Sequence, residues 1–130
     1  MDPKTALTRA RSILLVDYPG RVVPDSLARA GYAVFAHGGP RPDDYFAFSV
    51  QGEAVSEVRT GVRPEQADLL YTYRPLAELD DILRTARAVG AKTVWFQADA
   101  VIDPARLVEA RAQVEAAGFA WISGPILDAL

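Results

Sequence analysis

Residues 12–17 read SILLVD, a short apolar run that is followed by the turn-forming pair Pro19-Gly20. Its length and its unbroken apolar character predict a strand that is buried on both faces. Four further runs of strand length follow along the chain. They lie at residues 32–36 (YAVFA), 67–73 (ADLLYTY), 93–97 (TVWFQ) and 119–123 (FAWIS). Buried strands of this kind are typical of a parallel sheet.

Helical patterns separate most of these runs. They cover residues 22–30, 76–89 and 104–117. Gly31 and Gly90 stand where the first two helices would end, and Asp103-Pro104 supplies an N-cap and a first-turn proline for the third. Strands that alternate with helices at this spacing predict an α/β fold, in which helices cover both faces of a parallel sheet.

The predicted topology is a three-layer, Rossmann-like doubly wound sheet with its five strands in the order 3-2-1-4-5, since crossovers are right-handed. One segment departs from the alternation. Residues 45–50 and 54–59 alternate apolar and polar side chains about Gln51-Gly52, which predicts a β-hairpin between strands 2 and 3. An isolated hairpin is marginally stable and must pack on something, so a homodimer is favoured. We expect one domain over residues 1–130, with a core at about 12–123 and the hairpin at about 45–59.

Composition excludes several classes of protein. The 130 residues are 50% hydrophobic and 24% charged, as in an ordinary globular protein. The absence of cysteine excludes disulfides, thiolate metal sites and a cysteine nucleophile, and a single histidine gives no metal shell. The net charge of −3, without a basic cluster, argues against a nucleic-acid partner. No run approaches the roughly 20 apolar residues of a membrane span, and no signal peptide is recognised, so we expect a cytoplasmic protein without a membrane partner.

The predicted fold also indicates where a ligand would bind. In open parallel sheets, ligands bind outside the carboxyl ends of the strands, where the strand order reverses. The candidate residues are therefore those that follow the strands. They are Asp17, Tyr18, Pro19, Gly20, Arg21, His37, Gly38, Gly39, Tyr73, Arg74, Pro75 and Gln97, with Ala98 and Asp99 directly after them.

Three features of this set suit a phosphate-bearing ligand. Gly20 permits close approach of the backbone and precedes a helix, whose first amides attract an anion. Arg21 and Arg74 lie on two loops of one sheet edge, where they could converge on a diphosphate. Gly38-Gly39 leaves room for an adenosine. Neither the G-x-G-x-x-G fingerprint nor a P-loop motif occurs in the chain.

Each candidate also has a plainer interpretation. Asp17 would bind a ribose hydroxyl or repel phosphate in a functional role. In the plainer interpretation it is a turn residue and the ion-pair partner of an arginine. His37 stacks on a base, acts as an acid or base, or lies at the surface without a role. Tyr18 and Tyr73 stack on an adenine or pack in the fold. Gln97 hydrogen-bonds a ligand or only ends its strand.

Several segments together resemble one family. Residues 67–75 (ADLLYTYRP), residues 90–97 (GAKTVWFQ), Ala117-Gly118-Phe119 and the closing Ile122-Ser123 are similar to the small stand-alone CoA-binding proteins. That family shares a Rossmann-like domain with the α subunit of succinyl-CoA synthetase, and the resemblance runs from about residue 12 to 123. It implies that CoA lies across the carboxyl ends of the strands. Two loops differ from the family pattern: residues 16–20 (VDYPG) replace a Val-Gly-Ala-Ser-type loop, and residues 36–40 (AHGGP) replace a Val-Asn-Pro-type turn.

The sequence thus predicts non-catalytic binding of CoA, an acyl-CoA or a related adenine nucleotide. We expect no enzyme, because no nucleophile or acid–base pair stands in a recognisable motif. Two alternatives remain. The chain is a scaffold for protein interaction or regulation that has lost its ligand, or a small enzyme that acts on a nucleotide or acyl-CoA through His37 and Asp17.

Overall fold

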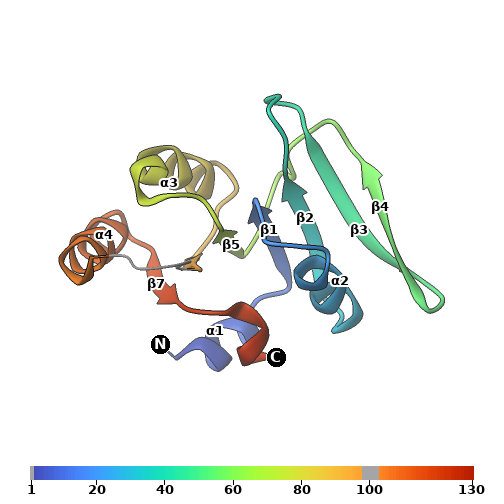
Figure 1. Ribbon diagram of the computed structural model, residues 1–130, viewed down its shortest axis with the longest axis horizontal. Coiled ribbons are helices and arrows are strands. Elements are labelled where there is room, and N and C mark those ends of the chain that lie inside the picture. The colour runs from blue at the N-terminus through green and yellow to red at the C-terminus, as the bar shows by residue number, and fades with distance from the viewer. Residues whose placement is uncertain (1, 98–102) are drawn as a thin grey trace.

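The computed structural model describes residues 2–97 and 103–130, which form a seven-stranded sheet with helices on both faces (Figure 1). The strands are β1 (Ser12–Val16), β2 (Ala33–His37), β3 (Tyr45–Gln51), β4 (Ala54–Arg59), β5 (Leu69–Thr72), β6 (Thr93–Phe96) and β7 (Ala120–Ser123). The helices are α1 (Pro3–Arg9), α2 (Val22–Arg29), α3 (Leu79–Ala88) and α4 (Pro104–Ala116), with short 3-10 turns η1 (Leu76–Glu78) and η2 (Ile126–Ala129).

The order of the strands differs from the prediction. The sheet runs β4-β3-β2-β1-β5-β6-β7, and its five parallel strands, counted along the chain, stand in the order 2-1-3-4-5. The predicted order 3-2-1-4-5 is therefore wrong. The physical reason is the hairpin, because β3 pairs antiparallel with the outer edge of β2 and occupies it. The next parallel strand, β5, pairs instead with the open edge of β1.

The hairpin itself forms where the alternating pattern indicated. Gln51 pairs with Ala54 across a tight turn in which Gly52 has a φ of 64°, a left-handed conformation that favours glycine. Phe48 is buried and Phe46 partly buried against the core beside α2. The packing that the hairpin needs is thus supplied within the chain by β2 and this core. The homodimer stays a prediction.

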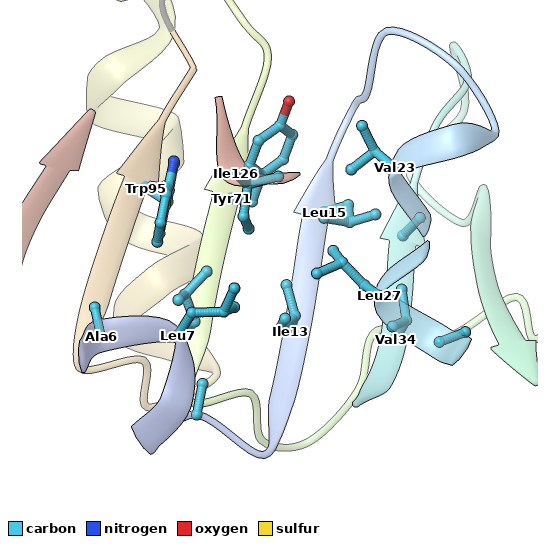
Figure 2. Packing of buried hydrophobic residues seen from close by; sticks show 14 of the residues in the cluster. Ala6, Leu7, Ile13, Leu15, Val23, Leu27, Val34, Tyr71, Trp95 and Ile126 are labelled. Carbon is cyan, nitrogen blue, oxygen red and sulfur yellow. The ribbon is translucent and has the colours of Figure 1, made fainter. Parts of the chain in front are cut away.

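Two cores lie on opposite faces of the sheet, and β1 explains why its run is apolar throughout. Ile13 and Leu15 point to the face covered by α1, α2 and η2, whereas Leu14 points to the face covered by α3 and α4 (Figures 1 and 2). All three are fully buried. Figure 2 shows Leu27 of α2 and Leu7 of α1 closing the first core over the strands.

The ends of the helices follow the predicted signals. The Asp103 carboxylate accepts a 3.0 Å hydrogen bond from the Ala105 amide at the start of α4. Helix α1, which the pattern of strands did not suggest, begins with the same device, because the Asp2 side chain precedes a proline and accepts from the Thr5 amide at 3.0 Å. Among the residues described, no helix has both the length and the apolar character needed to cross a membrane.

Candidate functional site

The observed strand order determines where the sheet opens at its carboxyl edge. Helix α2 follows β1 onto one face, and η1 and α3 follow β5 onto the other (Figure 1). A crevice forms where crossovers leave neighbouring strands toward opposite faces. It therefore lies between the carboxyl ends of β1 and β5. The order 3-2-1-4-5 would have placed it between β1 and β6.

A cleft of about 960 Å³ opens at this point on the side of α3. Its walls come from the end of β1, the loop between β2 and β3, and the segment from Arg74 into α3. Five of the predicted site residues line it, namely Asp17, His37, Gly38, Gly39 and Arg74. The other lining residues are Val16, Pro40, Pro42, Tyr45, Glu78, Asp81, Ile82, Arg84 and Thr85.

Arg74 links the two sides of the crevice. Its Nη1 donates to Asp17 Oδ2 at 3.2 Å, and its Nε and Nη2 donate to Glu78 Oε2 at 3.0 and 2.7 Å. The three side chains are 39–42% exposed, so water screens each pair. Hydrogen bonds from Arg74 to Glu78, and then to Asp17, raise the pKa of the Arg74 guanidinium. The guanidinium is held, fully charged, on the cleft wall.

Asp17 ends β1 in an uncommon backbone conformation. Its φ is 65°, a left-handed value that aspartate tolerates better than most residues. Its amide donates to the His37 carbonyl at 2.9 Å, and its Oδ1 accepts from the Tyr18 amide at 2.9 Å. The structure therefore combines the turn and ion-pair interpretations of Asp17, and leaves its Oδ2 on Arg74.

Arg21 lies apart from Arg74. Its Nε donates to Asp25 at 3.0 Å, its Nη2 donates to the Val55 carbonyl at 3.0 Å, and its guanidinium lies 5.2 Å from the centre of the Phe48 ring. Glu57 accepts from Nη1 at 3.3 Å. Arg21 thus ties α2 to the hairpin on the face opposite the cleft, and the structure does not bring the two arginines together.

The loop after β2 forms one wall of the cleft and is held in place by contacts among its own residues. His37 Nε2 lies 3.0 Å from the Arg41 carbonyl, and its ring packs edge-on against Tyr45 with 4.7 Å between centroids. Gly39 has a φ of 155°, and a Cβ placed on it would lie 2.3 Å from Asp44 Oδ2. That oxygen accepts from the Arg41 amide at 2.9 Å, a bond that lowers the pKa of Asp44. The position of the Asp44 carboxylate thus leaves no room for a side chain at Gly39.

Three other candidates lie at a second, smaller cavity of about 440 Å³ beside α2. Pro19, Gly20 and Gln97 line it. The remaining lining residues are Val22, Val23, Pro125, Leu127 and Asp128. A Cβ on Gly20 would meet no atom within 4 Å, and no side chain caps the first turn of α2. The buried Tyr71 donates its hydroxyl to Gln97 Oε1 at 2.6 Å, and Figure 2 shows that hydroxyl at the carboxyl end of β5.

The aromatic candidates pack in the fold. Tyr18 lies edge-on against Phe48 with 6.0 Å between ring centres, and burial raises the pKa of its hydroxyl. Tyr73 packs on the core beneath α1 and α2, and Pro75 precedes η1. Ala98 and Asp99 lie outside the described residues. The part of the chain that the structure describes contains no cluster of three or more His, Cys, Asp or Glu that could hold a metal.

Sequence reasoning missed three residues that shape the site. Glu78 stands four residues after Arg74, a spacing that places the two side chains together on a helical turn and was open to detection. Asp44 follows Arg41 by three residues in a predicted loop, without a comparable signal. Tyr71 was recognised only as part of a strand, because its bond to Gln97 depends on the pairing of β5 with β6.

Solved structures share this fold. Prb, described as a protein redesigned for binding, is 22% identical, with a TM-score of 0.64 and coverage of 96% of this chain and 84% of its own. A Thermus thermophilus protein is 22% identical, with a TM-score of 0.61 and coverage of 98% and 94%. A hypothetical protein from Pyrococcus horikoshii OT3 is 19% identical, with a TM-score of 0.64 and coverage of 98% and 86%. At these identities the likeness concerns the fold alone.

No curated protein matches the chain significantly. A known domain family does match it, over residues 16–125. That region contains both sides of the crevice, the hairpin and the loop that carries Gly38 and Gly39. The match extends over most of the chain and agrees with the resemblance seen in its motifs. The chain therefore belongs to the CoA binding domain family.

Proposed function

We propose that the chain binds CoA, an acyl-CoA or a related adenine nucleotide across the carboxyl edge of its sheet, and catalyses no reaction. The observation that carries the proposal is the cleft of about 960 Å³ at the β1–β5 crevice, with the Arg74 guanidinium on its wall. Membership of the CoA binding domain family supports this choice of ligand.

The residues at the edge suit the parts of such a ligand. The nucleotide end would lie in the cleft, where Arg74 supplies N–H donors and Gly38 and Gly39 add no bulk. The diphosphate would lie near the start of α2, where the helix dipole places partial positive charge and no side chain caps the first turn. The cavity beside Val22, Val23 and Leu127 is largely apolar and would take the uncharged arm of CoA.

The contacts of His37 support binding without chemistry. A general acid or base must reach the reacting group of its substrate. His37 instead has Nε2 against the Arg41 carbonyl at 3.0 Å and its ring against Tyr45. Asp17 is engaged by Arg74 and by the Tyr18 amide. His37 and Asp17, the two residues on which the enzyme alternative depends, thus make contacts that shape the carboxyl edge of the sheet.

Thermal denaturation with added ligands tests the proposal. A ligand that binds only the native state stabilises it by about 2.7 kcal/mol at 100 times its Kd. We expect CoA to raise Tm by several degrees. The Tm shifts with NAD, ATP and acetyl-CoA then show which parts of the ligand contribute to binding. Failure of all four at millimolar concentration would favour the ligand-free scaffold. Release of free thiol from acetyl-CoA that disappears in His37→Ala would contradict the absence of catalysis.

Gly20→Ala provides a matched variant for the position of the diphosphate. Its added methyl group meets no protein atom within 4 Å, so the free energy of unfolding should change by less than about 1 kcal/mol. The same methyl group would stand where the ligand approaches α2, so CoA affinity measured by calorimetry should fall about tenfold, which corresponds to roughly 1.4 kcal/mol. Unchanged affinity would show that the diphosphate does not approach Gly20.

A further inference from the structure

The charges of the cleft do not favour an anion as they stand. Among its lining residues, the carboxylates are those of Asp17, Glu78 and Asp81, and the guanidiniums are those of Arg74 and Arg84. Arg84 is paired with Asp81, and Arg74 with the other two carboxylates. A phosphate group of the nucleotide end that enters this cleft meets an excess of negative charge. It competes with these carboxylates for the N–H donors of the guanidiniums.

The two carboxylates on Arg74 are bound unequally. Glu78 accepts from Nε and Nη2, with its shortest contact at 2.7 Å, and comes from the turn directly after Arg74. Asp17 accepts only from Nη1, at 3.2 Å, and comes from the other side of the crevice. Glu78 therefore positions the guanidinium, whereas Asp17, which follows β1, takes a single hydrogen bond from Nη1.

We propose that Asp17 is a built-in competitor for the anionic part of the ligand, and that its carboxylate sets how tightly this chain binds phosphate groups. The inference rests on the proposed function. A phosphate can bind Nη1 of Arg74 only if it displaces Asp17 Oδ2 or lies close to it in spite of the electrostatic repulsion between the two anions. Phosphate-bearing ligands are bound more weakly than the cleft and its arginine would otherwise allow.

Asp17→Asn isolates this effect. Asparagine also tolerates a φ of 65°, and its Oδ1 can still accept from the Tyr18 amide. An amide nitrogen then replaces Oδ2, and it cannot accept a hydrogen bond from Nη1. Glu78 continues to hold Nε and Nη2. The variant therefore frees one edge of Arg74 and leaves the guanidinium in place.

Asp81→Asn is the matched control. It removes one negative charge from the same cleft, but from a pair with Arg84 whose side chains are 73–75% exposed. Calorimetric titration with CoA at fixed ionic strength compares the two variants with the unmodified chain. A charge about 6 Å from a bound phosphate, at an effective dielectric constant of about 40, predicts roughly tenfold tighter binding for Asp17→Asn. Asp81→Asn should gain at most about threefold.

Inorganic pyrophosphate separates this inference from the choice of CoA as ligand. Its binding is followed through the NMR signal of Arg74 Nε, and Asp17→Asn should bind it more tightly than the unmodified chain. If pyrophosphate gains this affinity and CoA binds neither protein, the proposed function fails and the competitor role stands. Equal pyrophosphate affinity, or equal gains in Asp17→Asn and Asp81→Asn, would overturn the role of Asp17.

Discussion

Replacing Gly39 with alanine tests whether the loop after β2 is held by its own packing. An ideal Cβ at Gly39 lies 2.3 Å from Asp44 Oδ2 and 2.8 Å from its Cγ, so the Asp44 side chain must move. Moving it breaks the 2.9 Å hydrogen bond from the Arg41 amide to the carboxylate. The backbone φ of 155° adds to the cost, since side chains rarely adopt it.

The size of the effect follows from these contacts. Holding alanine at a φ that side chains rarely adopt costs about 1–3 kcal/mol, and it displaces the Asp44 side chain as well. We expect Gly39→Ala to lower the free energy of unfolding by about 1–3 kcal/mol. In a chain of this size, 1 kcal/mol shifts Tm by roughly 3–5 °C, so Tm should fall by roughly 5–10 °C.

Gly38→Ala is the matched control, because its Cβ would lie 3.9 Å from Tyr18 Cε1, an ordinary contact. Calorimetric Tm values for the two variants are compared directly. The pKa of Asp44 provides a second measurement, since loss of the Arg41 hydrogen bond should return it toward its ordinary value. Equal Tm values for the two variants, with the pKa of Asp44 still lowered in Gly39→Ala, would refute the reasoning.

Two further predictions concern stability. Leu27→Ala removes a fully buried side chain between α2 and the sheet and should cost about 2–5 kcal/mol in urea denaturation, and a loss below 1 kcal/mol would contradict the packing described. Burial raises the pKa of Tyr18 and Tyr45, so the unfolded chain loses these phenolic protons first. The contribution of these two tyrosines to the free energy of unfolding should be complete below about pH 10 and should decline as the pH rises further. Urea denaturation between about pH 8 and 11.5 measures this decline, which should be smaller in Tyr45→Phe.

Much of the fold follows from local patterns. Unbroken apolar runs located the parallel strands, because β1 sends Ile13 and Leu14 into different cores. Alternation located the hairpin, and glycine and proline marked the helix ends. The strand order could not be read in this way. It depends on which edge of β2 or β1 is open when β5 pairs, and local periodicity carries no information about that choice.

The candidate site was predicted as a set of loops on one edge, and the structure places those loops there. The directions of the side chains were not predictable. Arg21 is held by Val55 and Glu57, whose positions depend on how the hairpin docks. Arg74 is held by Glu78, four residues away, and this contact was open to prediction from spacing alone. Contacts between neighbours in sequence are therefore the part of a site that a single sequence reveals best.

The hairpin also has a consequence for the order in which the chain folds. Strands β3 and β4 pair within residues 45–59, and hairpins of this kind form in microseconds. The pairing of β1 with β5 must close a loop that joins Asp68 to Ser12, 56 residues apart. We expect the local ribbon to associate with β2 before the distant strand arrives. One edge of the growing sheet is then already closed, and the late strand has a single docking position, beside β1.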